Sequence, residues 1–325
     1  MPTEAFGILI TGAGGMLGTD LVRALENDFE IIGLDKKPAP HLERPLEICD
    51  LLQERKLREV FMSRNPGLVI HCAALTDVDY CEDHAEEAVA QNVEATRNIV
   101  TICNDLGIPL VFFSTDYVFD GKKKGEYLES DPANPVSVYG RTKKDAEDHI
   151  LANAKSAVIF RITWLYGVFG RSFPRAILRQ IAETTKLTVV ADQIGRPTYT
   201  KDIAQALKVL LSSRRDKVFA PGARIYHLTN TGQVTWADFA RFILERVGRD
   251  DVTVEDMTSD KLNRPAPRPA NSLLNLEKSE RELGVILRPW QDAVAEFLVE
   301  LEEVRKAAEA KARAKAEAEG ASDQG

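Results

Sequence analysis

Three side chains near the middle of the chain have the types and spacing that carbonyl reduction requires. Thr115 follows the apolar run Ile108–Phe113, and Tyr139 and Lys143 stand four positions apart on a predicted helix. Residues at that spacing share one helical face. A free tyrosine titrates near about 10, and a neighbouring ammonium group lowers its pKa. We therefore expect Lys143 to lower the pKa of Tyr139, and Thr115 to donate a hydrogen bond to a carbonyl oxygen.

The start of the chain supplies the context that this common tyrosine–lysine spacing needs. The run Phe6–Thr11 predicts a buried strand, and a helical pattern follows the glycines Gly12, Gly15 and Gly18. Glycines allow a tight turn and close approach to a pyrophosphate, which the helix N-terminus attracts. Asp35 ends the next apolar strand, about 20 residues further on, where a ribose-binding acid is expected. This pattern predicts dinucleotide binding.

Strands and helices alternate through the first half of the chain, which is typical of βαβ units. The predicted fold is α/β, a doubly wound parallel (Rossmann) sheet with a smaller C-terminal substrate-binding lobe. We expect residues 1–167, with about 196–230, to form the cofactor-binding domain. About 168–195 and 231–300 form the substrate lobe, and 301–325 a charged helical or disordered tail without an assigned function.

Composition narrows the function class. The chain has 325 residues and a net charge of −8, which argues against a general nucleic-acid binder. No apolar run is long enough to span a bilayer, and the N-terminus lacks a signal-peptide layout, so no membrane partner is expected. The four cysteines show no metal-ligand spacing. We expect a cytoplasmic protein with no predicted metal ligands.

A proline-rich segment in the second half carries two arginines. The loop Arg264–Ser272 is stiffened by Pro265, Pro267 and Pro269. Its arginines suit bidentate binding of a diphosphate. A surface loop with solvated arginines has the same composition, so residue type alone leaves both interpretations open.

Together these motifs resemble the extended short-chain dehydrogenase/reductases, and within them the dTDP-4-dehydrorhamnose reductases. The resemblance covers roughly residues 5–300, and its most specific parts are Ser114–Gly121, Arg161–Gly167, Gly195–Thr198 and Arg268–Ser272. It implies that NAD(P)H delivers hydride to C4 of a dTDP-linked 4-ketosugar, dTDP-4-dehydro-β-L-rhamnose. In that reaction Tyr139 gives the proton, Lys143 holds the nicotinamide ribose, and Thr115 polarises the ketone.

The resemblance also implies binding roles for other residues. It places the deoxysugar at Val78, Asp116, Tyr117 and Trp164, and we add Arg268 as the contact for the diphosphate. It places the cofactor, besides Tyr139 and Lys143, along a path of strand ends and the glycine-rich turn, made by Gly12, Gly14, Gly15, Met16, Leu17, Asp35, Lys36, Asp50, Leu51, Ala73, Ala74, Thr76 and Asn92.

Cofactor choice remains open at Asp35. That carboxylate favours NADH, because it bonds a ribose hydroxyl and repels a 2′-phosphate. Lys36 and Lys37 beside it offset the repulsion, so we expect NADPH, with NADH as an alternative. The sequence leaves a structural magnesium ion and a homodimer open.

Three other functions share this fold. A nucleotide-sugar dehydratase usually carries an Asp-Glu pair after the threonine, whereas this chain has Asp116-Tyr117 and lacks the second carboxylate. A reductase of another nucleotide-linked 4-ketosugar would use the same chemistry. A non-catalytic subunit, like the regulatory β subunit of methionine adenosyltransferase, is a different class, and retention of Thr115, Tyr139 and Lys143 favours an enzyme.

Overall fold

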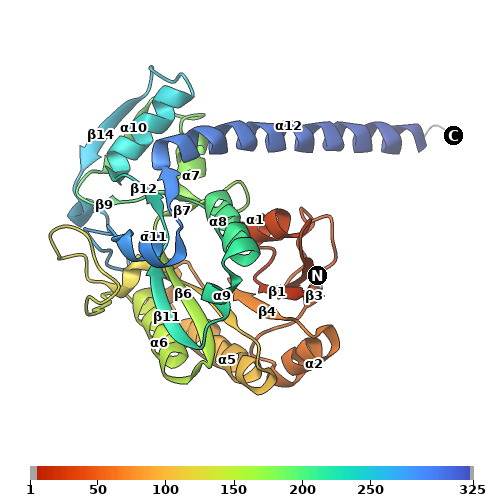
Figure 1. Ribbon diagram of the computed structural model, residues 1–325. Coiled ribbons are helices and arrows are strands. Elements are labelled where there is room, and N and C mark those ends of the chain that lie inside the picture. Colours follow the sequence, from red (N-terminus) through yellow and green to blue (C-terminus); the bar gives the residue numbers. More distant parts are fainter. Residues whose placement is uncertain (1–5, 323–325) are drawn as a thin grey trace.

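A seven-stranded parallel sheet forms the centre of the molecule (Figure 1). The computed structural model describes residues 6–322, with side chains described as far as residue 311. The strands run in the order β11-β6-β5-β4-β1-β2-β3, and every neighbouring pair is parallel. Their bounds are β1 Gly7–Thr11, β2 Glu30–Asp35, β3 Glu47–Ile48, β4 Leu68–His71, β5 Leu110–Thr115, β6 Ser156–Ile162 and β11 Gly222–His227. The predicted doubly wound sheet is confirmed.

Helices cover both faces of this sheet because successive side chains of a strand point to opposite faces. In β1, Ile8 and Ile10 belong to one hydrophobic cluster and Leu9 to the other. The first cluster is completed by α1 (Met16–Leu25) and α8 (Thr200–Ser213). The second is completed by α2 (Glu54–Arg64), α5 (Ala95–Leu106) and α6 (Val138–Asn153). Strand order reverses between β1 and β4, where ligands bind in such sheets.

A third hydrophobic cluster lies beside the carboxyl ends of the strands. Its buried residues include Tyr166, Phe239 and Phe297. Strands β8 (Lys186–Val190) and β14 (Thr253–Met257) pair in parallel here, and α7 (Phe173–Gln180), α10 (Trp236–Arg246) and α12 (Trp290–Ser322) pack around the cluster. The smaller strands are β7 Leu165–Tyr166, β9 Ile194–Gly195, β10 Thr198–Tyr199, β12 Asn230–Thr231, β13 Val234–Thr235 and β15 Leu287–Pro289.

Short helices complete the chain: α3 Val78–Asp83, α4 Ala85–Val89, the π-helical turn η1 Ala90–Glu94, η2 Asp116–Val118, α9 Arg215–Phe219, η3 Ser259–Lys261 and α11 Glu277–Leu283. The helical segment over 85–106 is therefore interrupted by one π turn. Among residues 6–322, no helix combines the length and the apolar character that crossing a membrane demands.

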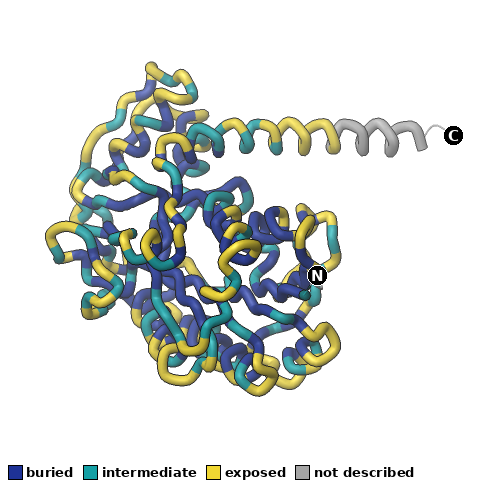
Figure 2. The backbone as a smooth tube through the Cα atoms, in the orientation of Figure 1, coloured by how far each residue is buried: buried dark blue, intermediate teal, exposed yellow. Residues whose placement is uncertain are grey.

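The C-terminal helix α12 continues far beyond the body of the protein (Figure 1). Its beginning packs into the third cluster through Ala293, Val294 and Phe297, and Figure 2 shows its later turns as exposed up to the part that is drawn in grey. The segment with the predicted charged tail is helical as far as Ser322, and residues 323–325 lie outside the described residues.

Candidate active site

A cavity of about 670 Å³ opens at the carboxyl ends of β1, β4 and β5, where the strand order reverses. The structure brings most of the residues that we predicted from distant parts of the sequence to its wall. These are Gly12, Gly15, Met16, Leu17, Asp35, Lys36, Leu51, Ala73, Ala74, Thr76, Val78, Thr115, Asp116, Tyr117, Tyr139, Lys143 and Trp164.

The glycine-rich turn forms one wall of this cavity. Gly12 has a left-handed φ of 67°, and a Cβ there would lie 2.7 Å from the backbone nitrogen of Ala73. A Cβ on Gly18 would collide with the carbonyl oxygen of Gly12, so glycine is required for α1 to pack on the turn. Helix α1 begins at Met16 and presents its unpaired N–H groups to the cavity. This turn and the volume beside it fit a dinucleotide with its pyrophosphate at the helix N-terminus.

Both carboxylate oxygens of Asp35 accept hydrogen bonds from backbone N–H groups. Oδ2 accepts a hydrogen bond from Gly14 N at 3.0 Å, and Oδ1 accepts one from Lys36 N at 2.7 Å. The ammonium of Lys36 lies 3.1 Å from Asp50 Oδ2 and 3.4 Å from Gln91 Oε1. Asp35 thereby holds the glycine-rich turn against the start of the β2–β3 loop, while it still lines the cavity.

Three residues that we placed on the cofactor path do not line this cavity: Gly14, Asp50 and Asn92. Asn92 is buried, and its amide bonds the backbone N–H and carbonyl of Leu75 at 2.7 and 3.1 Å and donates to Thr142 Oγ1 at 3.0 Å. Asp50 accepts from Leu52 N at 3.0 Å as well as from Lys36. For Asn92 and Asp50, the residue type showed that the side chain is polar but not in which direction it points. Both side chains support the wall of the cavity instead of forming it.

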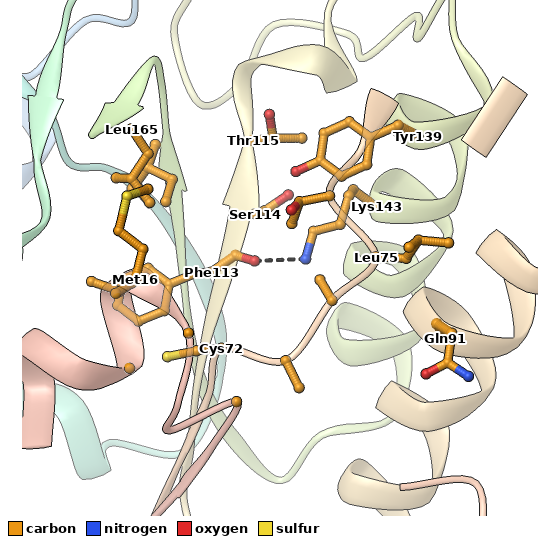
Figure 3. A pocket seen from close by; sticks show the side chains of 18 of the residues that line it. Met16, Cys72, Leu75, Gln91, Phe113, Ser114, Thr115, Tyr139, Lys143 and Leu165 are labelled. Atoms are coloured by element: carbon orange, nitrogen blue, oxygen red, sulfur yellow. Dashed lines mark hydrogen bonds between the residues drawn. The ribbon is translucent and has the colours of Figure 1, made fainter. Parts of the chain in front are cut away.

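Tyr139 and Lys143 reach the cavity from α6, and Thr115 faces them from the end of β5 (Figure 3). Ser137 caps α6 by accepting from Gly140 N at 3.2 Å. The ammonium of Lys143 is buried and donates to the carbonyl oxygen of Phe113 at 2.7 Å, the dashed line in Figure 3. Burial lowers the pKa of Lys143 to about 7, against the opposing effect of the Glu147 carboxylate.

The pKa of Tyr139 departs from our expectation. Burial raises it above the ordinary value, and the neighbouring Asp116 raises it further. The predicted net lowering of this pKa is wrong, because burial of the phenol and the Asp116 carboxylate outweigh any stabilisation of the phenolate by the Lys143 ammonium. Tyr139 therefore keeps its proton at neutral pH.

Thr115 is engaged within the site. Its hydroxyl donates to Asp116 Oδ1 at 3.0 Å and accepts from Tyr117 N at 3.2 Å. Asp116 is buried, also accepts from the hydroxyl of Ser272, and burial raises its pKa to about 6. For Thr115 to donate to a ketone, as we predicted, its hydroxyl has to rotate away from Asp116.

A second cavity of about 720 Å³ adjoins the first, and Tyr117, Trp164 and Arg171 line both. Trp164 has a left-handed φ of 44°, and its indole stacks on Trp236 with ring centroids 3.5 Å apart. A Cβ on Gly195 would collide with the Trp164 ring, which accounts for the glycine that begins the Gly195–Thr198 motif.

The second cavity is strongly cationic. No carboxylate among the described residues lines it. Five arginines do, namely Arg171, Arg175, Arg179, Arg264 and Arg268. Arg268, predicted from its loop, therefore lies in this cavity and not with the cofactor residues. We missed the three arginines of the segment 171–179, of which Arg175 and Arg179 stand four positions apart on α7. We also missed Gln91, Ser114 and Leu165 in the first cavity, whose residue types gave no signal.

The described residues contain no group of three or more His, Cys, Asp or Glu side chains that is arranged to hold a metal ion. The four cysteines are free; Cys49, Cys81 and Cys103 are buried and Cys72 is half-buried.

Comparison with known proteins gives a consistent family. The model of the family described as RmlD substrate binding domain matches residues 6–303. The chain is 37% identical over 290 residues to a probable dTDP-4,6-dihydroxy-2-methyloxan-3-one 4-ketoreductase of Streptomyces antibioticus, covering 89% of this chain and 93% of the relative. It is 36% identical to the dTDP-4-dehydrorhamnose reductase of Mycolicibacterium smegmatis, covering 88% and 83%.

A solved structure agrees with this family assignment. The crystal structure of dTDP-4-dehydrorhamnose reductase from Bacillus anthracis in complex with NADP matches with a TM-score of 0.83 and 29% sequence identity, and covers 91% of this chain and 99% of that one.

Proposed function

The chain belongs to the RmlD substrate-binding domain family, and from this premise we propose that it reduces the C4 ketone of dTDP-4-dehydro-β-L-rhamnose to give dTDP-L-rhamnose. NADPH is the hydride donor, with NADH as an alternative. The observation that carries the proposal is the position of Tyr139, beside Thr115, where a dinucleotide-shaped cavity meets a cavity lined by arginines. Reduction of a nucleotide-linked ketosugar needs one cavity for the cofactor, one for the sugar nucleotide, and a proton donor between them.

Bound NADPH supplies hydride to C4, the carbonyl carbon of the sugar. The electron pair of the C=O bond moves to oxygen, which takes the phenolic proton of Tyr139 and becomes the alcohol. The raised pKa of Tyr139 keeps that proton in place at neutral pH until the oxygen becomes basic. The phenolate that remains takes a proton from solvent, so one ketone, one NADPH and one proton give one alcohol and one NADP⁺.

Other residues position the reactants in this proposal. The ammonium of Lys143, held by Phe113 O, stabilises the Tyr139 phenolate and binds the nicotinamide ribose. Thr115 polarises the ketone after its hydroxyl leaves Asp116. Val78, Tyr117 and Trp164 contact the deoxysugar, and the arginine-lined cavity receives the dTDP diphosphate through Arg268.

We propose that residues 1–167 with about 196–230 form the NAD(P)-binding domain, and that about 168–195 with 231–300 form the substrate-binding lobe. The unpaired cysteines support a reducing compartment, the cytoplasm. Light scattering in solution tests the homodimer that the sequence leaves open.

A second candidate is reduction of another nucleotide-linked 4-ketosugar. The Streptomyces antibioticus relative, named for a different ketone, favours it. The test is to incubate the protein with NADPH and a panel of dTDP-linked 4-ketosugars and identify each product by NMR. Conversion of dTDP-4-dehydro-β-L-rhamnose with the highest kcat/KM supports the proposal. Preference for another ketosugar supports the second candidate, and binding without NADPH oxidation indicates a non-catalytic subunit.

A further inference from the structure

The short helix α3 lies between the two cavities. Its first residue, Val78, lines the cofactor cavity. Four positions further along the helix, Glu82 Oε2 accepts a hydrogen bond from Val138 N at 2.8 Å, at the start of the helix that carries Tyr139. Cys81 is buried between these contacts. These contacts fix α3 to the helix that carries Tyr139, so the backbone positions of the other residues of α3 are fixed as well.

Asp79 is the side chain of α3 that contacts the arginine loop. Its Oδ1 and Oδ2 accept from Nη1 and Nη2 of Arg268 at 3.0 and 2.8 Å, and Oδ1 also accepts from Ala266 N at 3.3 Å. A second guanidinium, that of Arg264, lies 3.8 Å from Oδ2. The hydrogen bonds from Arg268 hold the pKa of Asp79 below its usual range, so this carboxylate stays charged.

The donors of Arg268 show what this pairing leaves available. A guanidinium has five N–H groups in a planar fork. Nη1 donates to Asp79 and to the carbonyl oxygen of Ala266 at 2.9 Å, and Nη2 donates one hydrogen to Asp79. The Nε–H and the second Nη2–H lie parallel on one edge, which no carboxylate or carbonyl oxygen among the described residues occupies, although the Tyr117 hydroxyl lies within reach of the guanidinium. Arg268 lines the arginine cavity, so this edge is the one that suits a second anion.

We propose that Asp79 is a positioning residue for substrate binding: it fixes the Arg268 guanidinium so that the Nε/Nη2 edge binds the diphosphate of the sugar nucleotide. The proposal rests on the proposed function, because it takes the diphosphate to Arg268. Two carboxylate bonds leave the guanidinium one orientation, so less conformational freedom is lost when the ligand binds. Because α3 is bound to the catalytic helix at Glu82, the same contact sets the distance between diphosphate and Tyr139.

The test compares Asp79→Asn with Asp83→Asn. Asp83 ends the same helix, is exposed, and makes no side-chain hydrogen bond or ion pair among the described residues. Asp83→Asn therefore removes the same charge as Asp79→Asn but breaks no contact. We expect Asp79→Asn to weaken dTDP binding and raise the KM for the sugar nucleotide by ~10-fold or more, with kcat changed by less than ~3-fold. NADPH affinity should stay unchanged, which also shows that the variant is folded. Asp83→Asn should match the wild type in all four measurements.

Two results overturn the proposal. Unchanged dTDP affinity in Asp79→Asn reduces the Asp79–Arg268 pair to a structural contact, and tighter dTDP binding shows that Asp79 competes with the diphosphate for Arg268. Restored dTDP affinity in Asp79→Glu, which keeps the charge, would support the proposal.

Arg268→Ala separates this proposal from its premise. If Arg268→Ala leaves dTDP affinity intact, the diphosphate contact of the proposed function is wrong and the positioning role falls with it. If Arg268→Ala weakens dTDP binding and Asp79→Asn does not, only the positioning role is wrong. We expect the double variant to bind dTDP no more weakly than Arg268→Ala alone, because Asp79 acts through Arg268.

Discussion

The two adjoining cavities are built in different ways. The cofactor cavity is formed by the ends of parallel strands and the glycine-rich turn, and acidic and basic side chains both line it. The arginine cavity is formed by α7, β8 and loops from the second lobe, and all its charged lining residues are arginines. We therefore expect the first cavity to bind its ligand through shape and backbone N–H groups, and the second through charge.

Chemistry belongs where the cavities meet. Tyr117 and Trp164 line both, and Tyr139 lies beside Tyr117 with ring centroids 5.6 Å apart. A variant within one cavity should weaken one ligand, whereas a variant at the junction should slow the reaction while both ligands still bind. Each prediction below tests that distinction.

The largest effect is expected at the junction. Tyr139→Phe removes the proposed proton donor and leaves the ring that packs against Val138 and Cys81. Since a positioned general acid contributes ~10²–10⁴ in rate, kcat should fall at least ~10²-fold. Fluorescence titration with NADPH and calorimetry with dTDP should give wild-type affinities. Near-normal turnover would remove Tyr139 from the mechanism.

The second prediction concerns pH. Lys143 has a pKa lowered to about 7, so it is charged below that pH and neutral above it. The neutral amine does not stabilise a phenolate, and kcat/KM for NADPH should therefore fall up to tenfold per pH unit as the pH rises above about 7. Lys143→Arg, whose guanidinium stays charged, should be less active but lack this fall. A flat wild-type profile from pH 6 to 9 would contradict the assigned role.

The third prediction places Trp164 on the substrate side of the junction. Its strained backbone and its stack on Trp236 indicate a fixed surface for the deoxysugar. Trp164→Ala should lower kcat/KM for the sugar nucleotide by ~10-fold, which corresponds to about 1.4 kcal/mol. NADPH affinity measured on the same preparation should not change. A matching loss of NADPH affinity would assign Trp164 to the cofactor instead.

The two cavities also differ in how far the sequence predicts them. Residues at strand ends, such as Gly12, Asp35 and Thr115, were predictable because parallel strands end at one edge of a sheet. The arginine cavity joins α7 to a proline-rich loop about 90 residues later, and no local pattern shows that those segments meet.

Side-chain direction and burial account for the remaining differences between the sequence-based predictions and the structure. Asn92 turns to Leu75 and Thr142, and Asp50 turns to Lys36. Burial reverses the expected shift in the pKa of Tyr139, because desolvation depends on the whole packed environment. A spacing of four residues shows that two side chains share a face and leaves that environment undetermined.

The smallest effect is expected within the cofactor cavity, at Asp35. Its two oxygens already accept from Gly14 N and Lys36 N, so the carboxylate mainly holds the turn and repels a 2′-phosphate through its charge. Asp35→Asn removes the charge and keeps one backbone acceptor. The ratio of kcat/KM for NADPH to that for NADH should therefore rise roughly 3- to 10-fold, since partly exposed charges interact weakly.

Lys36 provides the opposite change in the same cavity. Lys36→Met should shift the ratio toward NADH, because it removes a cation that offsets the charge of Asp35. Both ratios come from initial rates at saturating sugar nucleotide, and dTDP affinity serves as the control because the second cavity is untouched. If neither variant changes the ratio, the adenosine ribose does not lie beside Asp35. If dTDP affinity changes as well, the two cavities are coupled and the separation between them is wrong.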